Sequence, residues 1–90
     1  MIDLTPRRLV RSQSPEADAL TGMRKSARAT RARDGLLPPP IDIGGGASAF
    51  YADELAEVIA ARAAGLGDED VRVIVARQIA ARRTYLGTAV

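Results

Sequence analysis

The sequence predicts a mainly α-helical domain with one small β-hairpin. Three observations support this fold class. Two helical segments meet at a Thr21-Gly22 break. Within residues 41–51, apolar and polar residues alternate before three consecutive glycines, and a second short segment follows them. Two amphipathic stretches follow from residue 53 onward. Their order predicts a winged helix-turn-helix followed by a C-terminal α-hairpin.

The composition limits the classes of function. A chain of 90 residues is one small domain, which buries only about 60 to 65% of the surface that its unfolded chain exposes. Cysteine and histidine are absent, which removes disulfides, thiolate nucleophiles and the commonest metal ligands and general bases. We therefore expect no catalytic residue, no metal, no cofactor and no small-molecule substrate, and hence no enzyme.

Neither a membrane span nor a signal peptide is apparent. No apolar run approaches the ~20 residues that cross a bilayer, and the first residues, MIDLTPRRLV, lack an apolar signal core. We expect a cytoplasmic protein without a membrane partner.

The net charge of +2 hides an uneven distribution. Residues 1–33 contain eight basic and three acidic residues, residues 34–71 one basic and eight acidic, and residues 72–90 four basic and none acidic. Because residues 1–33 are strongly basic, we expect an anionic partner for that part of the chain.

Residues 1–13 are expected to form an extended basic lead-in, anchored by Leu4, Leu9 and Val10. Its basic side chains would be solvated or would support phosphate contacts. They are Arg7, Arg8 and Arg11.

A short helix is expected from Ser14 to about Leu20. Serine caps a helix, proline suits the first helical position, and Glu16 faces the positive end of the dipole. Ala17 and Leu20 would form its buried face. Gly22 then permits the positive φ of a tight turn, and Met23 packs into the junction.

A basic helix should follow from Arg24, ending at Gly35 and the prolines beyond it. At 100° per residue Arg24, Arg28 and Arg31 form one stripe, with Lys25 at its edge. A narrow, weakly apolar stripe lies opposite, formed by Met23, Ala27 and Thr30. An α-helix fits the major groove of DNA, and an arginine fork matches a guanine edge or a phosphate. The predicted DNA-binding residues are Arg24, Lys25, Ser26, Arg28, Arg31 and Arg33. The alternative is a helix that is merely solvated.

Residues 41–51, IDIGGGASAFY, predict a β-hairpin with a flexible glycine tip. We expect this wing to meet DNA through Gly44, Gly45 and Gly46. A glycine-rich phosphate loop is the alternative, but neither GKS nor GKT follows.

Two helices are expected at the end of the chain. The first, from Asp53 to Ala64, places Leu55, Val58, Ile59 and Ala63 on one face. The second begins at Asp68 and runs to Arg83, with Val71, Ile74, Val75, Gln78 and Ile79 on one face. We expect these two helices to form an antiparallel hairpin. The chain would then divide into a DNA-binding domain over residues 14–60, a helical extension over 61–84 that packs on the core or dimerises, and a frayed tail over 85–90.

The order of these signals carries a resemblance. The matching points are Leu9-Val10-Arg11, Glu16, Thr21-Gly22, Lys25-Ser26, Gly35-Leu36-Leu37-Pro38 and Phe50. Residues 8 to about 60 resemble the AlpA-like and phage excisionase group of small winged-helix regulators, distant relatives of the MerR DNA-binding domain. The extension after Asp68 resembles one found in some AlpA-like phage proteins.

This resemblance implies sequence-specific binding of double-stranded DNA. The protein would regulate transcription of phage, prophage or mobile-element genes, or would act as an excisionase that directs an integrase. An integrase or RNA polymerase is then a possible partner. By the same resemblance Lys25 and Ser26 begin the DNA-facing helix, and Arg33 occupies an often basic position.

The chain departs from the family pattern in three places. Ala29 and Ala32 stand where larger apolar side chains are usual, and Gly46 stands where the wing tip is often basic. The family alignment also turns Arg28 and Arg31 partly inward. Charge periodicity points both at DNA, and we expect Arg28 to face outward because burying an unpaired guanidinium is costly.

Two other functions stay open. A protein-binding adaptor would use the amphipathic C-terminal hairpin. A homodimer would use the last helix, since so small a domain gains stability by association. An enzyme would depend on Asp53, Glu54 and Glu57, which are better explained as the acidic first turn of a helix.

Overall fold

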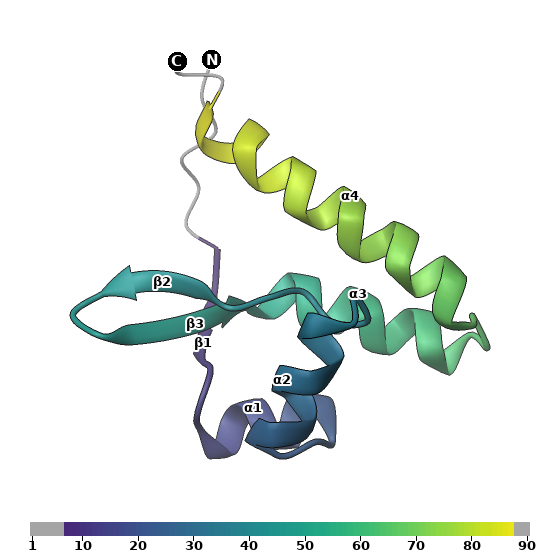
Figure 1. The fold of residues 1–90 in the computed structure, drawn as a ribbon, viewed down its shortest axis with the longest axis horizontal. Helices are drawn as coiled ribbons and strands as arrows, with labels where there is room; N and C mark the ends of the chain where they lie inside the picture. Colours follow the sequence, from purple (N-terminus) through teal and green to yellow (C-terminus); the bar gives the residue numbers. More distant parts are fainter. Residues whose placement is uncertain (1–6, 88–90) are drawn as a thin grey trace.

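The computed structural model describes residues 7–87, and side chains as far as Thr84. It contains a three-stranded antiparallel sheet and four helices (Figure 1). In chain order the elements are β1 (Leu9–Arg11), α1 (Pro15–Thr21), α2 (Lys25–Arg33), β2 (Ile41–Gly44), β3 (Ala47–Tyr51), α3 (Ala52–Ala63) and α4 (Asp68–Gly87).

The sheet has the order β1-β3-β2, so the first strand pairs with the last. Val10 lies opposite Phe50, and Ile41 lies opposite Ala49. The extended lead-in thus ends in an edge strand of the same sheet that carries the hairpin. Leu4, its other expected anchor, lies outside the described residues.

The start of α1 follows the sequence prediction, but its buried face does not. Ser14 Oγ accepts a hydrogen bond from the Ala17 N–H at 3.1 Å, and Pro15 is the first helical residue. Ala17 is fully buried, whereas Leu20 is 40% exposed, so its expected burial is wrong. Thr21 is buried instead, because its hydroxyl donates to the Ala17 carbonyl at 2.7 Å and so satisfies its polar group.

The turn and the end of α2 are confirmed. Gly22 has φ +67°, the left-handed conformation that glycine adopts without steric cost. Beyond α2, the N–H of Leu36 donates to the Arg31 carbonyl at 2.8 Å, which is the six-to-one bond of a Schellman ending. Leu37 and Pro38 are then buried, so the exit from α2 leads directly into the core.

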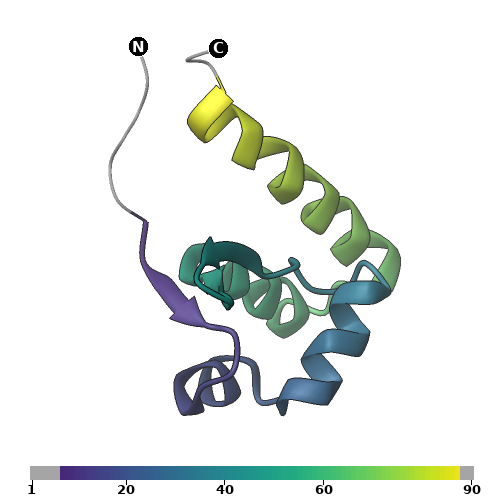
Figure 2. The same ribbon diagram turned by 60° about the vertical axis from the view of Figure 1, so that its left-hand side comes forward.

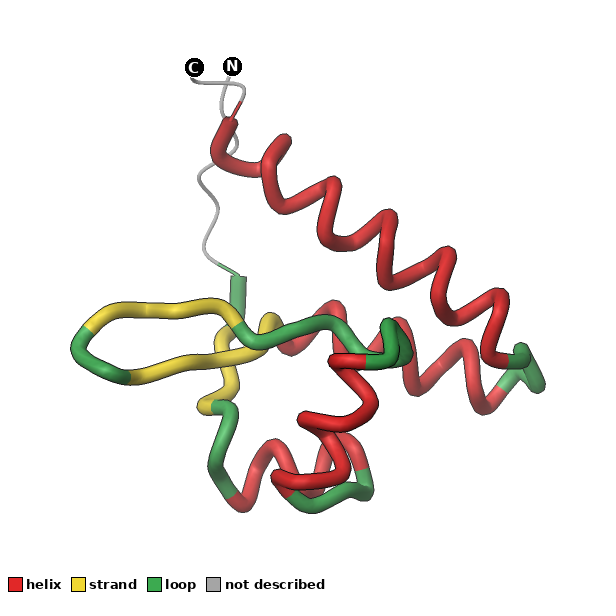
Figure 3. The backbone as a smooth tube through the Cα atoms, in the orientation of Figure 1, coloured by secondary structure: helices red, strands yellow, loops and turns green. Residues whose placement is uncertain are grey.

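The predicted hairpin is also confirmed. Asp42 and Gly44 flank an irregularity in the pairing of β2 with β3, and an Asp42 side-chain oxygen accepts the Gly44 N–H at 2.8 Å. The glycines at the tip, Gly44, Gly45 and Gly46, all have positive φ. The hairpin protrudes beyond the helices (Figure 3).

The two C-terminal helices form a hairpin over the core. Val71 and Val75 of α4 join Leu55 and Val58 of α3 in the buried cluster, which also contains Leu36, Leu37 and Phe50. Of the two expected roles of α4, packing on the core is therefore the observed one. The first turns of α4 lie beside the end of α2, where Arg72 Nε donates to the Asp34 carbonyl at 3.1 Å, and α4 then runs away from α1 (Figures 1 and 2).

The outer positions of α3 and α4 differ from the sequence prediction. Ala61 is buried where Ala63 was expected, and Ile79 is 44% exposed. Gln78 is buried because its amide donates to the Glu54 carbonyl at 3.0 Å. Each expected face was rotated slightly from the true one.

α4 is longer than predicted and is tied down near its end. Its backbone is helical to Gly87 rather than ending near Arg83, and the last residues of the expected tail, 88–90, lie outside the described residues. Arg82 donates to both carboxylate oxygens of Glu54 and to the Pro39 carbonyl. Within residues 7–87, no helix is both long and apolar enough to cross a membrane.

Candidate nucleic-acid interface

The basic residues divide into those that pair with a carboxylate and those that do not. All 13 Lys and Arg residues lie in the described part of the chain. Those that make an ion pair there are Arg7, Arg8, Arg28, Arg62, Arg72, Arg77 and Arg82. The six without an ion pair among residues 7–87 are Arg11, Arg24, Lys25, Arg31, Arg33 and Arg83.

The unpaired cations are concentrated in one region. Apart from Arg83 on α4, all of them belong to α2, to its N-terminal cap at Arg24, or to the end of β1 at Arg11. All are solvent-exposed. This part of the surface therefore carries positive charge that no carboxylate of residues 7–87 neutralises.

Two of the expected phosphate contacts are used inside the protein. Arg7 donates to both carboxylate oxygens of Asp53, at 2.9 and 2.7 Å, and its guanidinium lies 3.7 Å from the centre of the Tyr51 ring. These hydrogen bonds lower the pKa of Asp53. Arg8 pairs with Glu16. Of the three basic residues of the lead-in, Arg11 alone is without an ion pair among the described residues.

Arg28 is the buried cation of α2, with 2% of its surface exposed. Its Nη1 donates to Asp18 Oδ1 at 2.6 Å and to the Met23 carbonyl, and its Nη2 donates to the Ser12 carbonyl at 2.8 Å. The expectation that Arg28 faces outward is therefore wrong. Burial is costly for an unpaired guanidinium, but here three acceptors from three segments offset the lost hydration.

The burial of Arg28 fixes which face of α2 is turned to solvent. Ala32, four residues further on, is half-buried against the core, so positions 28 and 32 point inward. The opposite face is then centred on Ser26, Thr30 and Arg33, all of which are exposed.

The predicted stripes of α2 are corrected accordingly. The apolar stripe is wrong, because Met23 packs against the core while Ala27 and Thr30 are exposed. Arg24 and Arg31, expected beside Arg28, are exposed and flank the inward face. Thr30 was missed as a candidate contact, although its polar side chain was a signal for exposure.

The tip of the hairpin offers backbone groups only. Gly44, Gly45 and Gly46 are exposed, and no atom lies within 4 Å of where a Cβ would be on any of them. Backbone N–H groups in such a turn can approach a phosphate closely because no side chain intervenes.

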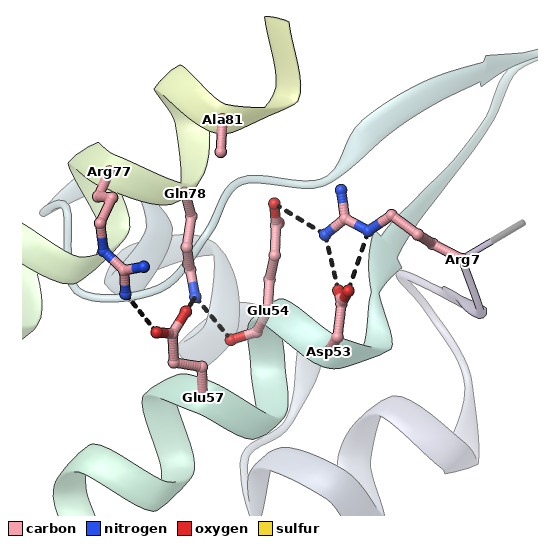
Figure 4. A pocket seen from close by; sticks show the side chains of 7 residues that line it. All are labelled: Arg7, Asp53, Glu54, Glu57, Arg77, Gln78 and Ala81. Atoms are coloured by element: carbon pink, nitrogen blue, oxygen red, sulfur yellow. Dashed lines mark hydrogen bonds and ion pairs between the residues drawn. The ribbon is translucent and has the colours of Figure 1, made fainter. Parts of the chain in front are cut away.

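The acidic residues of α3 lie away from α2 and are held by basic partners. Asp53 and Glu57 border a hollow of about 400 Å³ between the start of α3 and α4 (Figure 4). Glu57 accepts from the Gln78 amide at 2.8 Å and from Arg77, and these bonds lower the pKa of Glu57. No group of acidic side chains in residues 7–87 is arranged to hold a metal ion.

Comparison of the chain with models of known protein families, with curated protein sequences and with solved structures finds no match in any of the three. The candidate interface is therefore described from its residues alone. Arginines and a lysine without an ion pair among residues 7–87 lie on α2 and its cap, beside a protruding glycine-tipped hairpin.

Proposed function

We propose that this protein binds double-stranded DNA as a winged helix-turn-helix, with α2 as the recognition helix and the β2-β3 hairpin as the wing. The observation that carries the proposal is the division of the cations. Nearly every cation without an ion pair among residues 7–87 lies on or beside α2, whereas the other elements neutralise theirs, Arg83 excepted.

The order of elements supports the same proposal. A helix, a short turn with Gly22, a second helix and a β-hairpin follow one another along the chain. α2 is a single helix of nine residues, exposed on one face, and a helix of this kind fits the major groove.

The corrected orientation assigns roles within α2. Ser26, Thr30 and Arg33 occupy the centre of the exposed face and are placed to reach base edges. Arg24, Lys25 and Arg31 lie nearer the inward face but are exposed, and we propose that they contact phosphates. Arg28 leaves the proposed contact set because it is buried and both of its Nη atoms donate within the protein.

For the biological role we propose what the family resemblance implies. We propose a small regulator of phage or mobile-element genes, with an excisionase as the alternative. The adaptor hypothesis is less well supported, because Val71 and Val75 of α4 are buried in the core and are not available to a partner. Both regulatory roles require DNA binding, which is therefore the property to test first.

The test compares a double variant on α2 with a distant control. In Lys25→Ala, Arg33→Ala two exposed cations without an ion pair in the described structure are removed, and affinity for a fluorescein-labelled duplex should fall at least about 10-fold in fluorescence anisotropy. Arg83→Ala removes one exposed charge from α4, and its affinity should change less than about 2-fold. Equal losses in both variants would show that binding reflects net charge rather than this surface.

A further inference from the structure

Two adjoining hollows open between α2, the end of β1 and the hairpin. One, of about 160 Å³, is bordered by Lys25 and Ala29 of α2, and the other, of about 190 Å³, by Arg11 and Gly46. They share Ser12, Gln13 and Ser48 as common walls. We call these two together the helix-wing hollow.

The floor of the helix-wing hollow is fixed by hydrogen bonds. The Ser12 N–H donates to the Ser48 carbonyl at 3.0 Å, and the two serine hydroxyls lie 2.5 Å apart. Ser14 Oγ donates to the Arg11 carbonyl at 2.8 Å, which holds the backbone at the end of β1. A ligand would thus meet a surface that is already in place.

The lining of the hollow is rich in donors and contains no carboxylate. Arg11 and Lys25 make no ion pair with any described residue, and the Gln13 side chain makes no hydrogen bond with one. Arg28 also borders the hollow, and its buried Nε–H has no acceptor within residues 7–87. Such a set of donors fits an anion.

The geometry of a DNA duplex indicates which anion. Its major and minor grooves are separated by a single sugar-phosphate strand, so a protein with a helix in one and a hairpin over the other must face that strand between them. In this chain the surface between helix and hairpin is the helix-wing hollow.

We infer that the helix-wing hollow seats a phosphodiester of the strand between the two grooves. Arg11 and Lys25 supply the charge, and Gln13 donates an amide N–H. This inference rests on the proposed function. It adds Gln13 as a contact and gives Arg11, already expected to contact phosphate, a place between helix and wing.

The experiment measures anisotropy of the same labelled duplex over a range of salt concentrations. Arg11→Ala should weaken binding and reduce the slope of log affinity against log salt by about 1, because one fewer counterion is released. Gln13→Ala should weaken binding about 5-fold with the slope unchanged, because a neutral donor displaces no counterion. The exposed Gln13 makes no side-chain hydrogen bond within residues 7–87, so its variant should keep the wild-type circular dichroism and melting temperature.

The outcomes separate this inference from the function beneath it. Losses in Arg11→Ala and Gln13→Ala, with Arg83→Ala unaffected, support the phosphate seat. If wild type binds and the Lys25, Arg33 double variant does not, while Arg11→Ala and Gln13→Ala behave like Arg83→Ala, the seat is overturned and the α2 surface stands. If wild type binds no duplex even at low salt, the proposed function fails, and the phosphate seat fails with it.

Discussion

Arg28 shows how a single residue can serve the fold rather than the ligand. Its guanidinium joins the segment after β1 through Ser12, helix α1 through Asp18 and the turn through Met23. It therefore fixes the angle between α1 and α2 and turns the other basic residues of α2 to solvent.

Replacing Arg28 should lower the stability of the fold. Arg28→Ala removes three hydrogen bonds and the packing of a buried side chain, so the free energy of unfolding should fall by about 2–4 kcal/mol in urea denaturation followed by circular dichroism. Arg31→Ala, three residues along and exposed, should change it by less than about 0.5 kcal/mol. Equal stability of the two variants would contradict the structural role of Arg28.

The residue scale is also where prediction from sequence failed. The charge pattern of α2 correctly placed Arg24, Lys25 and Arg31 on the surface, where each is exposed. It misplaced Arg28, since the acceptors for Arg28 come from residues that are distant in sequence or belong to the backbone. A helical wheel contains no information about such partners.

At the scale of elements, the predictable features have local signals. The serine cap of α1, the glycine turn at Gly22 and the glycine tip of the hairpin are each encoded within a few residues. The pairing of β1 with β3 is different, because it joins Val10 to Phe50, forty positions apart in the chain. Local signals therefore predicted the elements, while the assembly of the sheet depended on contacts that the sequence does not display.

The role of α4 as a cover for the core can be tested on one helix. Val75 is 2% exposed and lies in the core cluster, so Val75→Ala should lower the free energy of unfolding by about 1.5–3 kcal/mol. Val73, two residues earlier, is 69% exposed, and Val73→Ala should leave stability within about 0.5 kcal/mol of wild type. Urea denaturation measures both.

A different pattern would reveal a different use of α4. If Val73→Ala destabilised the protein as much as Val75→Ala, and did so more strongly at high protein concentration, the exposed face of α4 would be an interface between copies of the chain.

At the scale of the whole molecule, the charges around α3 form ion pairs, whereas most of the cations of α2 are exposed. The acidic residues of α3 are occupied by Arg7, Arg77 and Arg82, which tie β1, α3 and α4 together. Apart from Arg28, the cations of α2 make no ion pair among residues 7–87. The paired charges thus hold β1, α3 and α4 together, whereas the exposed cations of α2 lie on the surface that we propose binds DNA.

The salt dependence of duplex binding tests the central claim most directly. Five exposed cations make no ion pair within residues 7–87: Arg11, the cap residue Arg24, and Lys25, Arg31 and Arg33 of α2. If about four or five of them contact phosphates, log affinity should fall with log salt at a slope of about −4. A slope between 0 and about −1, or no binding of a duplex at low salt, would contradict the proposal that this surface binds DNA.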